Sequence, residues 1–521
     1  MNFTPSTIVK ILMGVNIDTT YRDTYTFADE SAQIEFFTKK KKYDFTDFAY
    51  QRQSNSLKLP VNAELLFDCD YIMFRNESIR NKWFYAFITK VEFINQNVSE
   101  VFFEVDVMQT WYFDYSMMPS FVEREHVEDD TFGLNLVDEN LETGEYIINS
   151  GVVEQPETIA EFTPYIVVGV AELLPEYKPQ LTADVIDHSF TGLKYYYCSL
   201  VLAERVTELV KKYSEAGKGD AIVTVFMFPS QLMGIDKVSG SGWLTDEQLQ
   251  PIIGGNIKNL FAPLDGYAPK NNKLFTYPYR ALEVTTGTTA KMYNYEFFRN
   301  FNNMFTVIGT PSPAANILAI PNDYKGFNLN LDENVTMQPY PQCSWINDTY
   351  ANWLAQNQMS NALSLSIGAG KIAAGVLGAA TGAVTIGTAT AISGANDVLG
   401  VLTKIANHSV IPDSAKGSTA SANTFYANGQ WYFYLVPKCI RREYAERIDN
   451  FFSVYGYKVA NVKVPNINSR KSWNYLKTIN AALVGSIPSD ELAKIREVYN
   501  KGITFWHGDF VGDYNRENTI I

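Results

Sequence analysis

NKWFYAFITKVEFI (81–94) and VSEVFFEVDVMQTW (98–111) are the two segments that decide the fold class of this chain. In both segments apolar side chains recur at alternate positions, which is typical of a β-strand with one buried face. The connection Asn95-Gln96-Asn97 is short and turn-forming, so the two strands are predicted to form an antiparallel hairpin. The positions assigned to the buried face are Trp83, Tyr85, Phe87, Thr89, Val91 and Phe93, followed by Val101, Phe103, Val105, Val107 and Trp111.

The opposite face of this hairpin is polar. It carries Lys90, Glu92, Glu104 and Asp106, and we expect water to reach it, whether it looks outward or into a channel. The whole chain is rich in aromatic residues, with 33 Phe, 32 Tyr and 8 Trp, and such residues favour sheet. The fold class predicted from these patterns is α+β and mainly β.

The bulk composition indicates a folded protein of several domains. The chain has 521 residues, of which 46% are hydrophobic and 19% charged, and this length suggests three or four domains. Its net charge of −14 argues against a protein that grips duplex DNA, which would need a basic surface. An acidic wall past which DNA slides stays compatible with that charge.

Further elements are predicted from hydrophobic periodicity and from residues that end helices and strands. Helical spacing of Leu202, Val206, Leu209 and Val210 predicts a helix that ends near Gly217. The segments AIVTVFMFP (221–229) and WYFYLVP (431–437) are predicted strands, while 441–456 and 489–501 are predicted helices. Four regions result, namely a β domain in 1–150, inserted α+β modules in 151–345, a helical stem with an apolar loop in 346–429, and a C-terminal part in 430–521 that returns to the first domain.

Charge is distributed unevenly. Residues 123–187 contain 16 Asp or Glu and only two basic residues, Arg124 and Lys178. This region is either an ordinary acidic surface or an acidic ring made by several copies. Residues 438–477 contain nine basic and three acidic residues, and they would meet either the acidic region of a neighbouring subunit or nucleic acid. The run Lys39–Lys42 is read as a solvated turn beside a strand, with a nucleic-acid patch as the alternative.

The most unusual stretch is KIAAGVLGAATGAVTIGTATAISGAND (371–397). Its 25 inner residues carry no ionisable side chain and include five glycines. A helix of about 20 apolar residues is long enough to cross a bilayer. Predicted helices precede it (346–362) and follow it (397–411), so we interpret the stretch as an apolar loop on a helical stem. A buried helix and a Gly/Ala linker are the alternatives.

No catalytic constellation is found in the sequence. There is no Walker-type loop, no HExxH and no GxSxG, and the four histidines are scattered. His126 lies among carboxylates in EREHVEDD (123–130), but it has no second ligand motif, so a metal site there is a weak hypothesis. The N-terminal sequence does not have the form of a signal peptide. We expect no enzyme activity, no cofactor and no metal.

Segments at both ends of the chain resemble one known family. The sequence is similar to the tail-knob, or distal tail tube, proteins of small, short-tailed, protein-primed phages of Gram-positive bacteria. The apolar stretch lies where that family has a long hydrophobic loop. The segments that carry the resemblance are YIMF (71–74), NKWFYAFIT (81–89), FEVDVMQTW (103–111), VEREHV (122–127), RREYAERIDNFFSVYGYKVANVKVPN (441–466), SRKSWNYLKT (469–478) and NKGITFWH (500–507).

The resemblance implies a structural protein at the tail tip of the virion. Six copies would form a ring of tail-tube-like antiparallel β domains around a channel for DNA, attached to the proximal tail tube or connector protein. Apolar loops would close the channel and enter the host cytoplasmic membrane during ejection. The residues expected in the membrane-active loop are Ile372, Val376, Leu377, Gly378, Gly382, Val384, Ile386, Ile392, Val398 and Leu399.

Two other functions would account for the same sequence features. A secreted-type pore-forming protein would insert the same apolar segment, but it would need a signal peptide. A tail-associated cell-wall hydrolase would need a catalytic set that the sequence does not offer. The structural tail protein is therefore the function we expect.

Overall fold

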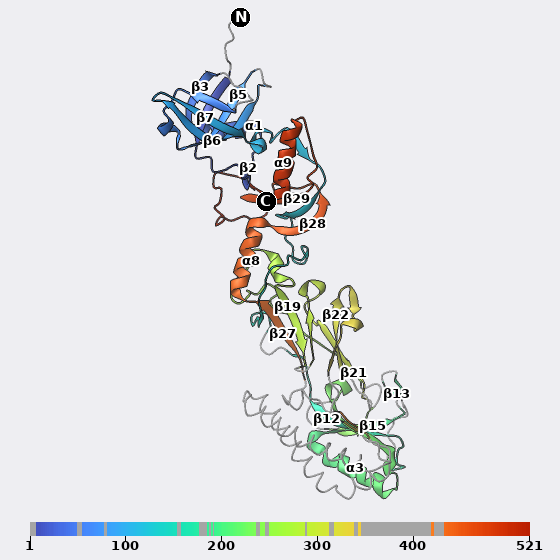
Figure 1. Ribbon diagram of the computed structural model, residues 1–521. Helices are drawn as coiled ribbons and strands as arrows, with labels where there is room; N and C mark the ends of the chain where they lie inside the picture. Colours follow the sequence, from blue (N-terminus) through green and yellow to red (C-terminus); the bar gives the residue numbers. More distant parts are fainter. Residues whose placement is uncertain are drawn as a thin grey trace. The chain divides into compact units, whose positions relative to one another are not determined.

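The protein is described by a computed structural model that divides the chain into two compact units. Unit 1 comprises Met1–Glu142, Pro269–Leu274 and Glu443–Ile521, and unit 2 comprises Thr143–Ala268 and Phe275–Arg442. Antiparallel sheets dominate both units, as the predicted fold class requires (Figure 1). The structure describes residues 7–48, 55–77, 81–153, 158–176, 185–186, 189–190, 192–235, 240–244, 249–286, 289–311, 317–337, 342–344, 418–420 and 432–521.

The first sheet of unit 1 has six strands in the order β3-β1-β5-β6-β7-β4. Most of its strands lie near the blue end of the colour scale in Figure 1. The strands are β1 (Thr7–Met13), β3 (Lys41–Phe48), β4 (Ser56–Leu59), β5 (Cys69–Asn76), β6 (Trp83–Asn95) and β7 (Val98–Val105).

The predicted hairpin is confirmed, since β6 and β7 pair antiparallel and Asn95 lies opposite Val98. The prediction that the hairpin has a single buried face is wrong, because the register places Phe87 opposite Glu104 and Ile88 opposite Phe103. The two predicted apolar sets therefore lie on opposite faces of the sheet, and both faces are covered.

Two hydrophobic clusters cover these faces. Trp83, Tyr85 and Phe87 pack with Phe37, Trp473 and Trp506 in one cluster. Val101 and Phe103 belong to the other cluster, which also contains residues of β1, β4 and β5. The polar face predicted for the hairpin is thus replaced, along part of its length, by a second core.

A break in the strand register explains why the outer half of β6 departs from simple alternation. The ladder is irregular between Ile88 and Lys90, so one extra residue lies in β6 there. Val91 then packs in the same cluster as Ile88. Thr89 and Phe93, both predicted to be buried, are exposed, and Phe93 retains 63% of its accessible surface.

Asp106, which was predicted to be in water, is in fact 1% exposed. It caps the short helix α2 (Val107–Thr110), because its Oδ1 accepts hydrogen bonds from the amides of Met108 at 2.9 Å and Gln109 at 3.1 Å. Its Oδ2 accepts a third from the hydroxyl of Tyr71 at 2.7 Å. Burial raises the pKa of Asp106 to about 6, and these three hydrogen bonds oppose that rise.

The run Lys39–Lys42 links a helix to a strand. Lys39 ends α1 (Glu30–Lys39), a helix that the sequence analysis missed, and Lys41 begins β3. Each of the four lysines forms an ion pair with a carboxylate, from Glu35, Asp509, Asp44 and Asp68 in turn. The predicted strand beside this run is present, but only Lys40 lies in a turn, and the side chains of Lys40 and Lys42 are only 14% and 24% exposed. The four ion pairs do not favour the nucleic-acid alternative.

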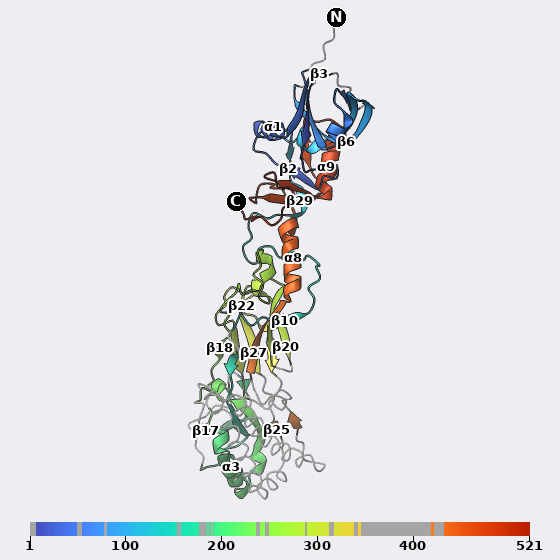
Figure 2. The ribbon, with the colours of Figure 1, turned by 90° about the vertical axis from the view of Figure 1, so that its left-hand side faces the viewer.

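The second sheet of unit 1 joins the two ends of the chain. Its order is β2-β31-β29-β9-β28, and β2 pairs with β31 in parallel. Helix α9 (Ser489–Lys501), which was predicted, lies beside β29 in both views of the ribbon (Figures 1 and 2). The strands are β2 (Asp23–Tyr25), β9 (Ser120–Glu125), β28 (Tyr457–Lys463), β29 (Trp473–Ile479) and β31 (Ile503–Trp506), and a separate pair is formed by β8 (Tyr115–Met117) and β30 (Leu483–Gly485).

Helix α8 (Arg442–Tyr455) agrees with the predicted helix and ends at Gly456. Gly456 has φ of 64°, a left-handed conformation that favours glycine. A Cβ atom at this position would also collide with the backbone of Glu125 and His126. Glycine is therefore required here both for the end of the helix and for the close approach of β9.

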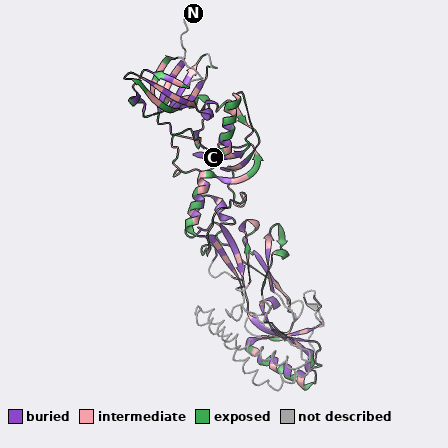
Figure 3. Ribbon diagram, in the orientation of Figure 1, coloured by how far each residue is buried: buried purple, intermediate pink, exposed green. Residues whose placement is uncertain are grey.

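Unit 2 is built from three larger sheets. In the first of them, β12 is buried along its whole length, as Figure 3 shows in purple. Helix α3 (Glu204–Glu215) buries Val206, Leu209, Val210 and Tyr213, which confirms the predicted helix. This sheet runs β17-β15-β12-β16-β25-β26, with β12 (Pro164–Val170), β15 (Lys194–Ser199), β16 (Ile222–Pro229), β17 (Ser241–Trp243), β25 (Gln342–Ser344) and β26 (Ser418–Ala420).

The other two larger sheets of unit 2 have five strands each. One contains β27, the predicted strand after residue 430, which pairs with β10, β11 and β19. Its strands are β10 (Tyr146–Ile148), β11 (Thr158–Glu161), β19 (Arg280–Thr285), β20 (Ala290–Tyr293) and β27 (Tyr432–Ile440). The other consists of β18 (Ile252–Gly254), β21 (Phe305–Gly309), β22 (Ile317–Tyr324), β23 (Phe327–Leu329) and β24 (Val335–Met337), and β13 (Val185–Ile186) with β14 (Ser189–Phe190) forms a small extra pair.

Three sequence predictions fall outside the described residues. They are the helix at 346–362, the apolar stretch 371–397 and the returning helix at 397–411. None of the helices in the described part of the chain combines the length and apolarity needed to cross a bilayer.

Candidate functional site, a buried ion-pair centre in unit 1

The residues predicted to form the membrane-active loop cannot be placed. All of them, Ile372, Val376, Leu377, Gly378, Gly382, Val384, Ile386, Ile392, Val398 and Leu399, lie outside the described residues. The other predicted feature that bears on function is the pair of oppositely charged regions, and these are described in unit 1.

The acidic and basic regions meet inside one chain. Strand β9 lies between β28 and β29, and its carboxylates pair with lysines from both neighbours. Glu123 is 2.9 Å from the Nζ of Lys477 on β29, and Glu125 pairs with Lys463 on β28. We had expected the basic region to meet a neighbouring subunit or nucleic acid, and these two lysines instead have partners within the chain.

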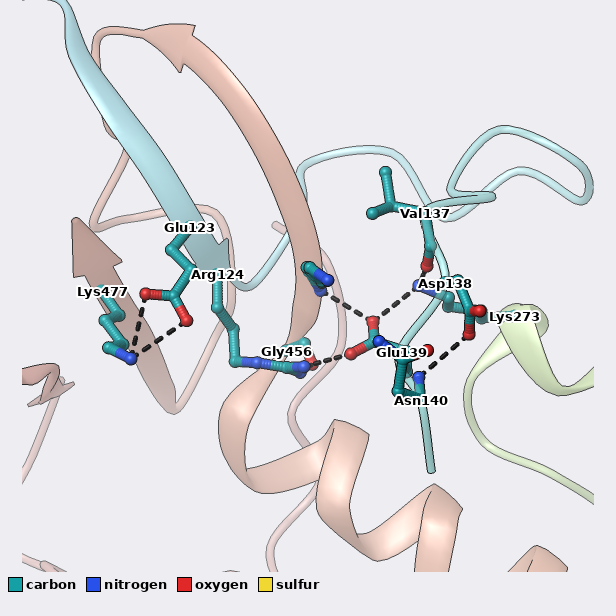
Figure 4. Close-up of polar contacts among 10 residues, drawn as sticks. Glu123, Arg124, Val137, Asp138, Glu139, Asn140, Lys273, Gly456 and Lys477 are labelled. Carbon is teal, nitrogen blue, oxygen red and sulfur yellow. Dashed lines mark hydrogen bonds and ion pairs between the residues drawn. The ribbon is translucent and has the colours of Figure 1, made fainter. Parts of the chain in front are cut away.

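The centre of this charge pairing is Glu139, whose side chain is fully buried. It lies in the loop after β9 and takes three donors, as Figure 4 shows. Its Oε1 accepts from the Nζ of Lys273 at 2.6 Å and from the amide of Lys458 at 2.8 Å. Its Oε2 accepts from the guanidinium of Arg124. One carboxylate thus joins the loop, the segment 269–274 and the start of β28.

Lys273 is almost as deeply buried, with 3% of its side chain exposed. Besides Glu139 it donates to the carbonyl of Val137 at 2.7 Å, and it lies over the rings of Phe452 and Tyr457. Burial lowers the pKa of Lys273, and the charge of Glu139 opposes that shift. Because the two charges are buried together, removal of Glu139 would leave the charge of Lys273 without its carboxylate, whereas removal of Lys273 would leave Glu139 with Arg124 alone.

Arg124 links the ion-pair centre to helix α8. One of its Nη atoms donates to the carbonyl of Gly456 at 2.7 Å, while the other pairs with Glu139. Its guanidinium lies 4.7 Å from the ring centroid of Phe451. This planar group therefore fixes the C-terminal end of α8 against the acidic loop.

Two further carboxylates hold the backbone of the segment 269–274. Asp449 of α8 accepts from the amides of Lys270 at 2.8 Å and Asn271 at 3.1 Å. Asp130 accepts from the amide of Asn272 at 3.0 Å. With the Glu139–Lys273 pair, four consecutive residues are each held by a carboxylate, and the segment is in this way fixed within unit 1.

His126 has a structural role in the same region. Its Nδ1 accepts from the amide of Tyr475 at 2.7 Å, and its Nε2 lies 3.2 Å from the carbonyl of Ser453. Burial lowers its pKa to about 3, so the ring stays neutral. Both ring nitrogens are occupied by backbone, and no group of side chains suited to hold a metal ion is found among the described residues.

Sequence reasoning did not find Glu139 or Lys273. Each is one charge among many, and their separation of 134 positions in the sequence gives no local pattern. The available signal was weak: Arg124 is one of only two basic residues in the acidic region.

In unit 1, ion pairs between acidic and basic side chains hold strands and loops together. Residues 5–116, which contain the first sheet of unit 1, match the family model described as the N-terminus of the caudoviral major tail protein. This part of the chain is therefore similar to tail proteins of tailed phages.

The family is shown by the rest of the chain. Residues 246–519, more than half of the sequence, match the family model described as the C-terminal domain of the tail knob protein gp9 of Bacillus phage phi29. The chain belongs to this family of phage tail knob proteins. The resemblance drawn from the sequence is confirmed.

Individual relatives extend the similarity over the whole chain. The tail knob protein gp9 of Bacillus phage phi29 is 27% identical over 99% of this chain and 98% of its own length. The tail knob protein gp9 of Bacillus phage B103 is 24% identical with the same coverage. The structure of the tail knob protein gp12 of bacteriophage C1 matches with a TM-score of 0.64 at 12% identity, over 99% of this chain and all of that one. The last match concerns the fold alone.

The protein is therefore a structural component of the phage tail and not an enzyme. This excludes the cell-wall hydrolase that the sequence analysis kept as an alternative. The buried ion-pair centre fixes parts of unit 1 to one another.

We predict that Glu139→Gln destabilises unit 1 by about 3–5 kcal/mol, because Lys273 and Arg124 would stay buried and charged without their anion. Urea unfolding followed by tryptophan fluorescence measures this loss, since Trp473 and Trp506 lie in the core of unit 1. The matched control is Glu142→Gln, an exposed glutamate three residues away, for which we expect a change of about 0.5 kcal/mol or less. Equal effects of the two substitutions would contradict a central role of Glu139.

Proposed function

We propose that six copies of this protein form the distal tail tube of the virion and conduct DNA during ejection. Apolar loops from residues 346–429 close the tube before ejection and then enter the host cytoplasmic membrane. The opposite end of the tube joins the proximal tail tube or connector protein, and DNA passes through the lumen without sequence-specific contacts. This places the protein at the tail tip.

The observation that carries the proposal is the extent of the similarity to named tail knob proteins. It covers 99% of this chain and 98% of the phi29 relative, so the similarity is not restricted to one domain. The solved tail knob of bacteriophage C1 adds a match in fold over the whole chain.

An exposed apolar row on unit 1 supports contact between copies. Phe121 on β9 lies directly opposite Val462 on β28 and Ile479 on β29, so the three side chains form a row across one face of the sheet. Their exposed fractions are 38%, 62% and 48%. Strand β28 is the last in its sheet among the described strands, and such an edge offers unpaired backbone groups to another chain. A second copy of the chain would cover both the row and the edge.

The charge of the chain supports a role in conducting DNA. A protein of net charge −14 repels phosphates at long range, and Lys463 and Lys477 beside β9 are used in ion pairs with its carboxylates. DNA would therefore move past such a wall without being held. A tube that bound DNA tightly would oppose ejection.

The composition of the apolar stretch supports insertion into a membrane. Its 25 residues without an ionisable group exceed the about 20 that a helix needs to cross a bilayer. Gly378 and Gly382 have the spacing that allows helices to approach closely in membranes. Six such segments around one axis would shelter one another before ejection.

We predict that Val462→Asp reduces ring formation at least tenfold, because a charge would be buried in the contact between copies. Mass photometry distinguishes the 58.8 kDa chain from its hexamer, and negative-stain images show the ring. Val484→Asp is the matched control, since Val484 on β30 is also 62% exposed but lies outside the row. A monodisperse monomer of the unaltered protein across micromolar concentrations would refute the tube.

We predict that the unaltered protein releases dye from liposomes at low pH or in mild detergent, and that Val384→Asp with Ile386→Asp abolishes the release. A charge deep in hydrocarbon costs about 2.5–3.5 kcal/mol on insertion scales. The variant should still form rings, which separates this test from the preceding one. Equal leakage from both proteins would rule out membrane insertion by this stretch.

A further inference from the structure

Unit 1 contains a cleft of about 710 Å³. Its walls come from the loop after β9, the segment 270–272, the end of α8 and the C-terminal residues 514–520. This size is ordinary for a small-molecule site. Neither the ion-pair centre nor the proposed tube gives this cavity a role.

Arg470 lines this cleft and is only 8% exposed. No acceptor among the described residues lies within hydrogen-bonding distance of its Nε, which is fully buried. The nearby carboxylate of Asp130 attracts the guanidinium, but its oxygens already accept from the hydroxyl of Tyr457 at 2.7 Å and the amide of Asn272 at 3.0 Å. A guanidinium has five N–H donors, and a buried donor without an acceptor costs about 1–3 kcal/mol.

The surroundings of Arg470 suit an anionic ligand. Lys270 and Arg516 also line the cleft and are exposed, so they add positive charge at its surface. The charge of Arg516 is shared with Asp513, whose Oδ2 lies 3.1 Å from its Nε. Asp130 and Glu517 are the acidic residues of the lining. Asp130 accepts from two neutral donors and keeps its negative charge beside Arg470, and Glu517 is exposed, so its charge is screened by water.

An aromatic wall gives the cleft a defined shape. Trp473 and Tyr514 meet edge to face, with ring centroids 5.2 Å apart. The indole of Trp473 is fixed by a hydrogen bond to the carbonyl of Ser453 at 2.9 Å. The C-terminal residues are held over the cleft because the amide of Lys471 donates to the carbonyl of Thr519 at 3.0 Å. The cavity is therefore built from fixed parts.

We propose that this cleft is an oxyanion site in which Arg470 binds a carboxylate or a phosphate group. The fork of a guanidinium matches two oxygens of either group. The oxyanion comes either from a free anion in solution or from an acidic side chain of a second copy. Occupation of the cleft completes the hydrogen bonding of Arg470 and ties the C-terminal residues to the core of unit 1.

The test compares the unaltered chain with Arg470→Met, which keeps the length of the side chain and removes its charge and donors. Thermal unfolding is measured in potassium phosphate and in sodium acetate, each against potassium chloride of equal ionic strength. We expect a saturable rise in Tm for the unaltered chain and an affinity at least about tenfold lower in Arg470→Met. Arg205→Met, which alters an exposed arginine of α3, should bind as the unaltered chain does.

The two sources of the oxyanion give different results. A free anion raises Tm of the monomer as well as of the assembled protein. A carboxylate from a second copy leaves the assembled protein insensitive to added anion, and Arg470→Met then lowers the fraction of rings. The proposal is overturned if phosphate and acetate change Tm equally in the unaltered chain and in Arg470→Met, and if both assemble alike. The comparison of Tm with added anion does not require ring formation, so its failure can be distinguished from a failure of the proposed tube.

Discussion

The carboxylate of Glu139, shared between Arg124 and Lys273 in the interior, is the interaction on which unit 1 depends. It joins three segments that are far apart in the sequence: the loop after β9, residues 269–274, and the start of β28. Buried charges of this kind contribute little stability over apolar packing, but they are expensive to leave incomplete. The centre therefore fixes the positions of these segments, and an incomplete centre would cost more than it contributes when complete.

The unequal distribution of charge along the chain has a physical explanation in this arrangement. The acidic region folds back between basic strands of the same chain, so that Glu123 and Glu125 neutralise Lys477 and Lys463. What remains is an acidic protein in which part of the basic region is already paired. Such a balance is compatible with a tail component past which nucleic acid moves, because Lys463 and Lys477 already have carboxylate partners.

Local patterns predicted the fold well where neighbours in sequence decide the structure. Helices α3, α8 and α9 and strands β6, β7, β16 and β27 follow from periodicity and from stop signals such as Gly456. The faces of the β6–β7 hairpin were predicted wrongly, since the irregularity near Thr89 and the register depend on pairing between strands. Asp106 was assigned to water because alternation cannot distinguish a solvated carboxylate from a helix cap. The family was recognised from segments at both ends, and the membrane-active loop stays a prediction.

The site was harder to predict than the fold, because its partners lie far apart in the chain. Lys273 and Glu139 have no common motif, and Arg470 can be recognised as a candidate binding residue only when the cleft around it is known.

The central claim is that carboxylates fix residues 270–273 within unit 1. Hydrogen exchange followed by mass spectrometry tests it most directly, through the amides of Lys270, Asn271 and Asn272. The account predicts that they exchange as slowly as the amides of β29, whereas complete exchange within seconds, as in a solvated loop, would contradict it.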